Sequence, residues 1–147
     1  MNDFIAMLDP NLIYIAHKIK EDKIIIQVAS SRTIVLCPYC KTYSTKVHST
    51  YQREFQDLPI MNKKVIILLN NRKMFCTNPE CKHKTFAERF DFLAVNARKT
   101  ERLIDNILKV SSNVSSLTAA SLLSDNTATI GKSSICRLLK KNASEYR

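Results

Sequence analysis

The sequence predicts an α+β fold with a β-rich first part and a helical last part. Runs of β-branched residues such as "KIIIQVASS" and "KKVIILLNN" dominate the first 75 residues, as expected for strands. From about residue 96 the apolar residues recur at helical spacing instead. Within the β-rich part, two cysteine pairs with the spacings C-x2-C and C-x4-C are separated by 35 residues.

The length of 147 residues suits one ordinary domain or two small ones, and the 45% hydrophobic content allows a modest core. We divide the chain into residues 1–36, 37–95 and 96–147. The first segment is expected to form a short helix ended by Asp9-Pro10 and then a β-hairpin that packs on the second segment. In the second segment, Asn70-Asn71 is expected to form a turn or bulge.

The spacing of the paired cysteines predicts one structural Zn²⁺. Two cysteine turns separated by a β-rich insert bring four thiolates to a tetrahedral ion at roughly 2.3 Å each. The second turn, "CTNPEC", is wider than usual, and Asn78-Pro79 is expected to tighten it. Residues 37–95 are therefore predicted to form a zinc-ribbon-like β domain whose metal ligands are Cys37, Cys40, Cys76 and Cys81.

A redox role is the alternative for Cys37-Pro38-Tyr39-Cys40, which matches a glutaredoxin dithiol. That dithiol lies at a helix N-terminus, which lowers the thiol pKa. Here "KTYSTKVHSTYQ" follows without helical periodicity, so the structural role is favoured. Four thiolates also leave no open position on the ion, so hydrolytic zinc is not expected. His48 and His83 are weaker alternative ligands, and Cys136 is expected to be a small packed residue.

Three helical stretches of about ten residues follow in the third segment. "TERLIDNILKVSS" begins at the N-cap Thr100, and "SSLTAASLLSD" begins at a serine cap. "GKSSICRLLKK" begins at Gly131 and is expected to turn Ile135, Leu138 and Leu139 inward, with Asp125-Asn126 supplying the turn before it. These lengths and the short polar connection predict a three-helix helix-turn-helix unit over residues 96–147.

The net charge of +10 is unevenly distributed. Residues 1–36 are neutral, residues 37–99 carry +7 and residues 100–147 carry +3. Such an imbalance favours a polyanionic partner, most simply nucleic acid. No apolar run approaches the roughly 18 residues of a membrane span, and the N-terminus is no signal peptide. A cytoplasmic protein without a membrane partner is therefore expected, in which cysteines bind metal in preference to forming disulfides.

Taken in order, these motifs resemble the N-terminal zinc-finger domain of ISL-three-type insertion-sequence transposases. The resemblance extends over nearly the whole chain, including "ARKTERL" and the helical unit behind it. It rests on Cys-Pro-x-Cys, His48, Arg53, Asp57-Leu58-Pro59, Arg72, Cys76, Cys81 and Thr85-Phe86-Ala87-Glu88.

In that family the helix-turn-helix is followed by an RNase H-like catalytic domain with an acidic triad. This chain ends at Arg147, just after the helical unit. The resemblance therefore implies a zinc-dependent protein that recognises transposon terminal inverted repeats in double-stranded DNA. Strand cleavage and joining are not expected from this chain.

The last helix, from Lys132, is expected to enter the major groove. The expected base contacts lie in its exposed first turns and are Lys132, Ser133, Ser134 and Arg137. The expected phosphate contacts lie in its later turns and are Lys140 and Lys141. A second basic surface is expected from Arg53, Arg72, Lys73, Lys82, Lys84 and Arg89. Asp57 and Glu88 are expected to pair with those arginines and not to catalyse.

Three other functions stay open from the sequence. One is a stand-alone zinc-finger and helix-turn-helix transcriptional regulator, the second is a zinc-stabilised adapter that binds protein, and the third is an RNA-binding zinc ribbon. A homodimer is compatible with each of these functions.

Overall fold

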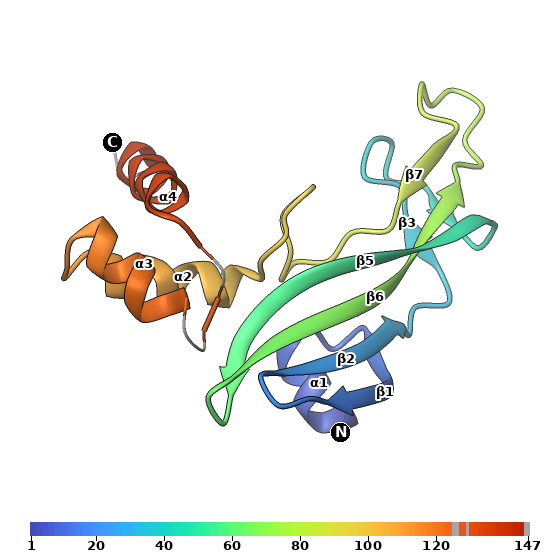
Figure 1. Ribbon diagram of the computed structural model, residues 1–147. Coiled ribbons are helices and arrows are strands. Elements are labelled where there is room, and N and C mark those ends of the chain that lie inside the picture. Colours follow the sequence, from blue (N-terminus) through green and yellow to red (C-terminus); the bar gives the residue numbers. More distant parts are fainter. Residues whose placement is uncertain (125–126, 129, 146–147) are drawn as a thin grey trace.

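The computed structural model has a mixed α+β architecture and describes residues 1–124, 127–128 and 130–145 (Figure 1). The sheet-rich part comes first, and three of the four described helices follow it, as the sequence predicts. In chain order the elements are α1 (Asn2–Leu8), β1 (Leu12–Ile19), β2 (Lys23–Ser30), β3 (Val35–Leu36), β4 (Tyr43–Ser44), β5 (Val47–Ile60), β6 (Lys63–Phe75), β7 (Thr85–Ala87), α2 (Glu101–Ser111), α3 (Ser116–Ser124) and α4 (Lys132–Glu145).

Strand β6 is the central strand of the main sheet. It pairs antiparallel with β5 along one edge, and along the other edge with β2 in parallel and then with the short β7. Strand β1 extends the sheet by pairing antiparallel with β2, which confirms the predicted hairpin. Helix α1 ends where Asp9 turns to an extended conformation, as the sequence predicts.

The long β5–β6 hairpin turns at residues that the sequence does not mark. Met61 and Asn62 form its two-residue loop with φ of 50° and 61°, as a hairpin turn with two left-handed residues requires. The predicted turn or bulge at Asn70-Asn71 is wrong, because β6 runs through both residues in register with β5. Asn71 is tolerated there because its buried side chain donates to the Tyr51 hydroxyl at 2.7 Å.

Two separate cores lie on opposite faces of β6, because side chains alternate along a strand. Its odd-numbered residues from Val65 to Leu69 belong to the larger core, which α1, β1, β2, β5 and the segment 90–93 complete. Met74 belongs instead to a small core that contains the cysteines and Phe86. The members of the larger core are Ile5, Leu12, Ile26, Val28, Phe55, Val65, Ile67, Leu69, Phe90, Phe92 and Leu93.

Helices α2, α3 and α4 share a third core, in which Leu103, Ile107 and Ile135 are fully buried. Thr100 caps α2 by accepting a hydrogen bond from the Leu103 amide, as predicted. The predicted turn at Asp125-Asn126 lies outside the described residues. No helix in the described part of the chain is long and apolar enough to cross a membrane.

A buried carboxylate ties these helices to the sheet. Asp57, in β5, accepts hydrogen bonds from the Thr100 hydroxyl and from Arg102 Nε, both at 2.8 Å. Beside it, the Gln56 amide donates to the Arg98 carbonyl and the Gln56 carbonyl accepts from the Thr100 amide, both at 2.9 Å. The start of α2 is therefore held against β5. Helices α2, α3 and α4 lie at one end of the sheet, and the cysteine-bearing turns lie at the other (Figure 1).

A second carboxylate, Glu88, is fully buried and joins three segments. It forms ion pairs with Arg72 at 2.9 Å and with Arg32 at 3.2 Å, and it accepts from the Ser30 hydroxyl at 2.6 Å. The predicted pairing of Glu88 with an arginine of the basic set is thus confirmed for Arg72. Asp57 pairs instead with Arg102, which was not in that set.

We expect Glu88→Gln to lower the free energy of unfolding by about 3 kcal/mol, because two arginines would then face a neutral amide in place of a buried carboxylate. Urea unfolding of the zinc-loaded protein measures the change. Glu54→Gln, on the exposed side of β5, is the matched control and should stay within about 0.5 kcal/mol of the parent. Equal losses for both variants would contradict this role of Glu88.

Candidate metal centre

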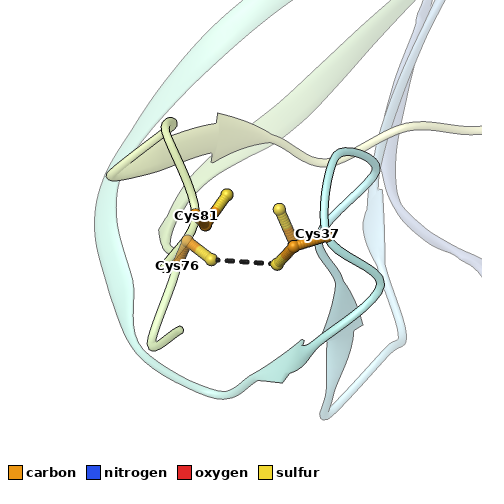
Figure 2. A group of neighbouring side chains, drawn as sticks. Cys37, Cys76 and Cys81 are labelled. Atoms are coloured by element: carbon orange, nitrogen blue, oxygen red, sulfur yellow. Dashed lines mark hydrogen bonds between the residues drawn. The ribbon is translucent and has the colours of Figure 1, made fainter. Parts of the chain in front are cut away.

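The four predicted cysteine ligands come together at one end of the sheet. All four sulfurs lie within 4.8 Å of one another, and Figure 2 shows the Cys37, Cys76 and Cys81 side chains converging from two turns. Sulfurs around a tetrahedral zinc with bonds of about 2.3 Å are about 3.8 Å apart, so these spacings fit the ion. The sulfurs of Cys40 and Cys76 are 3.4 Å apart, which is too long for a disulfide bond of about 2.05 Å.

The first cysteine turn closes the small β3–β4 hairpin. Cys37 follows β3 directly, its amide donates to the Thr42 carbonyl at 2.9 Å, and its carbonyl accepts from the Lys41 amide at 2.9 Å. Lys41 completes the turn in the left-handed region with φ of 63°. Strands β4 and β5 follow this turn, so no helix begins there, which agrees with the preference for a structural over a redox motif.

The second cysteine turn connects β6 to β7. The Asn78 carbonyl accepts from the Cys81 amide at 3.1 Å, and its side-chain oxygen accepts from the Glu80 amide at 3.0 Å. The tight turn predicted at Asn78-Pro79 is thereby confirmed. Because Cys76 follows β6 directly, the sheet itself sets the position of this half of the site.

The core around the sulfurs is too small to hold two turns by apolar packing alone. Apart from cysteines, its buried members are Val35, Met74 and Phe86. Outside it, the rings of Tyr39 and His83 stack at 3.6 Å between centroids and join the two turns at the surface. A metal ion is the remaining cross-link that such a small domain needs.

Residues 35–83 match the family model described as the zinc-finger of transposase IS204/IS1001/IS1096/IS1165. The matched range covers about a third of the chain and contains all four cysteines. No curated protein and no solved structure matches the chain. The chain thus carries a transposase-type zinc ribbon with Zn²⁺ as its cofactor, and the resemblance beyond residue 83 stays a prediction.

The alternative ligands lie apart from the sulfurs. Within the described residues the metal-binding group consists of the four cysteines. The His48 ring contacts Phe75 edge-on and the His83 ring stacks on Tyr39. Cys136 lies in α4, half-buried, with its sulfur 3.5 Å from the Ser116 hydroxyl.

The predicted DNA-contact residues fall into two groups by exposure. Arg53 and Arg72 are half-buried. The Arg72 guanidinium donates to Glu88 and to the Arg32 carbonyl, and Arg53 Nη2 donates to the Ala97 carbonyl at 3.0 Å. Ser134 is also half-buried. The exposed members are Lys73, Lys82, Lys84, Arg89, Lys132, Ser133, Arg137, Lys140 and Lys141.

Sequence reasoning missed two arginines that hold the domain together. Arg32 reaches Glu88 across 56 residues of sequence, so no local pattern marks it. Arg102 lies in "ARKTERL", a string noted for its resemblance to the family, but its partner Asp57 is 45 residues away. Such pairs become visible only after β5, β6 and α2 are placed.

In the metal-free protein the thiols differ in acidity. A hydrogen bond from the Thr42 side chain is the main cause that lowers the pKa of Cys40 to about 6. The Asn78 amide lowers the pKa of Cys76, but desolvation and the neighbouring thiols outweigh it and raise that pKa to about 12. The pKa of Cys81 is raised as well. The hydrogen bond from the His83 amide lowers it, but desolvation by burial and two neighbouring thiols outweigh that effect.

We expect one zinc per chain, lost together with the folded ribbon in Cys37→Ser and in Cys76→Ser. Removing one thiolate opens the tetrahedral site, and zinc binding supplies folding free energy to such small domains. Metal content by atomic emission and the melting temperature measure both effects. Cys136→Ser, in α4, is the control and should keep one zinc. Full zinc content in Cys37→Ser would contradict the four-sulfur site.

The apparent zinc affinity should fall as the pH falls. At pH 8 the raised pKa values of Cys76 and Cys81 keep both thiols protonated in the metal-free protein, so zinc must displace the protons. Each displaced proton lowers the affinity about tenfold per pH unit, so the protons of Cys76 and Cys81 alone lower it by about a hundredfold from pH 8 to pH 7. Competition with a chelator of known affinity at both pH values measures it, and an affinity independent of pH would contradict the proton displacement.

Proposed function

We propose that this protein binds double-stranded DNA at the terminal inverted repeats of a transposon, with α4 in the major groove. Support comes from the zinc ribbon's match to a transposase zinc-finger and from the exposed basic face of α4, which is the observation that carries the proposal. In this proposal α2, α3 and α4 act as a helix-turn-helix unit in which α4 is the recognition helix.

Helix α4 has the side-chain distribution that groove binding requires. Ile135 is fully buried in the core shared with α2 and α3, and Leu138 and Leu139 pack against that core. The opposite face exposes Ser133, Arg137 and Lys140, and Lys132 is exposed at the start of the helix. The first turn holds no acidic residue that would repel DNA. Arg137 lies one turn beyond Ser133, so both can reach base edges from the same side of the helix.

A second DNA-facing surface would lie on the zinc ribbon. Lys73, Lys82, Lys84 and Arg89 are exposed around the β6–β7 end. We leave Arg72 out of this proposed surface because its guanidinium is already bound to Glu88. Phosphate contacts from these side chains would position the protein on the duplex without reading its sequence.

We assign recognition and not strand transfer to the described part of the chain. Of its buried carboxylates, Asp57 and Glu88 are each engaged by arginine, and Asp9 accepts a hydrogen bond from the Asn11 amide. The four cysteines are the one potential metal-binding group among the described residues, and their four thiolates leave no position on the ion for a substrate. This arrangement favours an accessory or regulatory role in transposition over catalysis by these residues.

The proposal is tested by binding of the zinc-loaded protein to labelled duplex DNA. A selection from random duplexes identifies the preferred site, and affinity is then measured from about 50 to 200 mM salt. Strong salt dependence with preference for one duplex sequence supports the proposal, since phosphate contacts release counterions. Absence of duplex binding at low salt, or a preference for duplex RNA, would contradict it.

Arg137→Ala should weaken binding to the selected site by about 1–3 kcal/mol and binding to random DNA much less, because a base-edge contact is lost. Lys18→Ala, an exposed basic residue on β1, is the charge-matched control and should change neither. Equal losses of binding free energy on both DNAs would indicate that Arg137 contacts a phosphate and not a base edge.

An adapter that binds protein is favoured by a different surface. Helix α1, β2 and the tip of the β5–β6 hairpin line an apolar cavity of about 490 Å³. Phe4, Met7 and Met61 contribute to it and are largely exposed to solvent. Exposed apolar patches of this kind occur at protein interfaces. Lack of binding to any nucleic acid in the experiment above would favour this function.

A further inference from the structure

We propose that a cleft beside the zinc ribbon binds one unpaired base of a DNA strand together with its phosphate. The inference rests on the proposed function in that it takes DNA as the partner. It adds a site that α4 does not contribute to. The cleft lies between the first cysteine turn, β5 and the segment 87–96.

The size of the cleft suits a single nucleotide. Its volume is about 240 Å³, below the roughly 300–1,000 Å³ of sites for drug-sized ligands. A planar base fits such a space, whereas a stacked base pair of a duplex does not. The residues lining it are Tyr39, Tyr51, Arg53, Ala87, Glu88, Arg89, Phe90, Leu93, Val95 and Asn96.

Two tyrosines give the cleft partly exposed aromatic surfaces. Tyr39 is 49% exposed and Tyr51 is 41% exposed. Each is held in place from behind, because Tyr39 stacks on His83 and the Tyr51 hydroxyl accepts from the buried side chain of Asn71. Rings fixed before binding lose little entropy when a base stacks on them, and each stacked base contributes to affinity irrespective of its identity.

Two arginines make the cleft suitable for a phosphate. The Arg89 guanidinium lies over the Tyr39 ring, 5.4 Å from its centre, and donates to the Tyr39 hydroxyl at 3.4 Å. The Arg89 carbonyl accepts a hydrogen bond from Arg32 at 2.8 Å. The Arg53 side chain donates from one amino group to the Ala97 carbonyl, and no other hydrogen bond of this side chain is found within the described residues. Glu88 does not cancel these charges, because Arg32 and Arg72 already neutralise it.

The resulting combination is aromatic surface beside guanidinium groups, which matches sites that bind single-stranded nucleic acid. Apolar side chains of Phe90, Leu93 and Val95 complete the wall and can contact the edge or face of a base. Such a site would engage a base that is splayed from the duplex or lies in a single-stranded tail next to it.

The test compares a blunt DNA duplex with the same duplex carrying a short single-stranded thymidine tail, at fixed salt, by fluorescence anisotropy with zinc-loaded protein. We expect the tail to tighten binding. Tyr39→Ala and Tyr51→Ala should each remove about tenfold of affinity for the tailed DNA and leave the blunt duplex unchanged. Tyr51→Phe, which keeps the ring but loses the hydrogen bond to Asn71, should retain most of the tail effect.

Tyr43→Ala is the matched control, because Tyr43 is also an exposed tyrosine of the zinc ribbon but does not line the cleft. It should leave both affinities unchanged, and zinc content verifies that each variant is folded. A tail that adds nothing, or tyrosine variants that all behave like Tyr43→Ala, overturns the cleft while leaving duplex binding intact. Lack of binding to either DNA overturns the proposed function and the cleft together.

Discussion

Hydrogen bonding along both edges of β6 holds every other part of the sheet in place. One edge carries β5 over almost the whole strand, and the other carries β2 and then β7. Alternation along the same strand supplies the larger core on one face and places Met74 in the small cysteine core on the other. Because Cys76 follows β6 directly, the position of the metal centre is set by the sheet and not by a separate domain.

Zinc binding stabilises the cysteine turns, as apolar packing stabilises the other parts of the chain. The larger core joins α1, strands β1, β2, β5 and β6, and the segment 90–93, whereas the cysteine core has three buried members that are not cysteines. Two turns of so few residues cannot exclude enough water to hold each other, so a tetrahedral ion between them supplies the missing free energy. The stacked rings of Tyr39 and His83 add a contact at the surface, where the proposed cleft begins.

Two buried carboxylates organise the basic residues. Glu88 forms ion pairs with Arg32 and Arg72, and Asp57 forms an ion pair with Arg102 at the start of α2. A count of charges along the chain therefore overstates the charge that faces solvent. The lysines of the ribbon and the basic face of α4 stay exposed, and the binding proposals rest on these residues and on the cleft arginines.

The α+β order, the β1–β2 hairpin, the N-cap of α2 and the four cysteines could all be predicted from the sequence, because each depends on local spacing or local hydrogen bonds. The same reasoning mistook Asn70-Asn71 for a turn, because asparagine favours turns locally but the Tyr51 hydroxyl binds the Asn71 side chain within the sheet. Three features required the folded chain: the parallel pairing of β2 with β6, the choice of arginine by each carboxylate, and the meeting of Tyr39, Tyr51 and two arginines in one cleft. Those contacts join residues far apart in the sequence, and the strands must pair before the residues can meet.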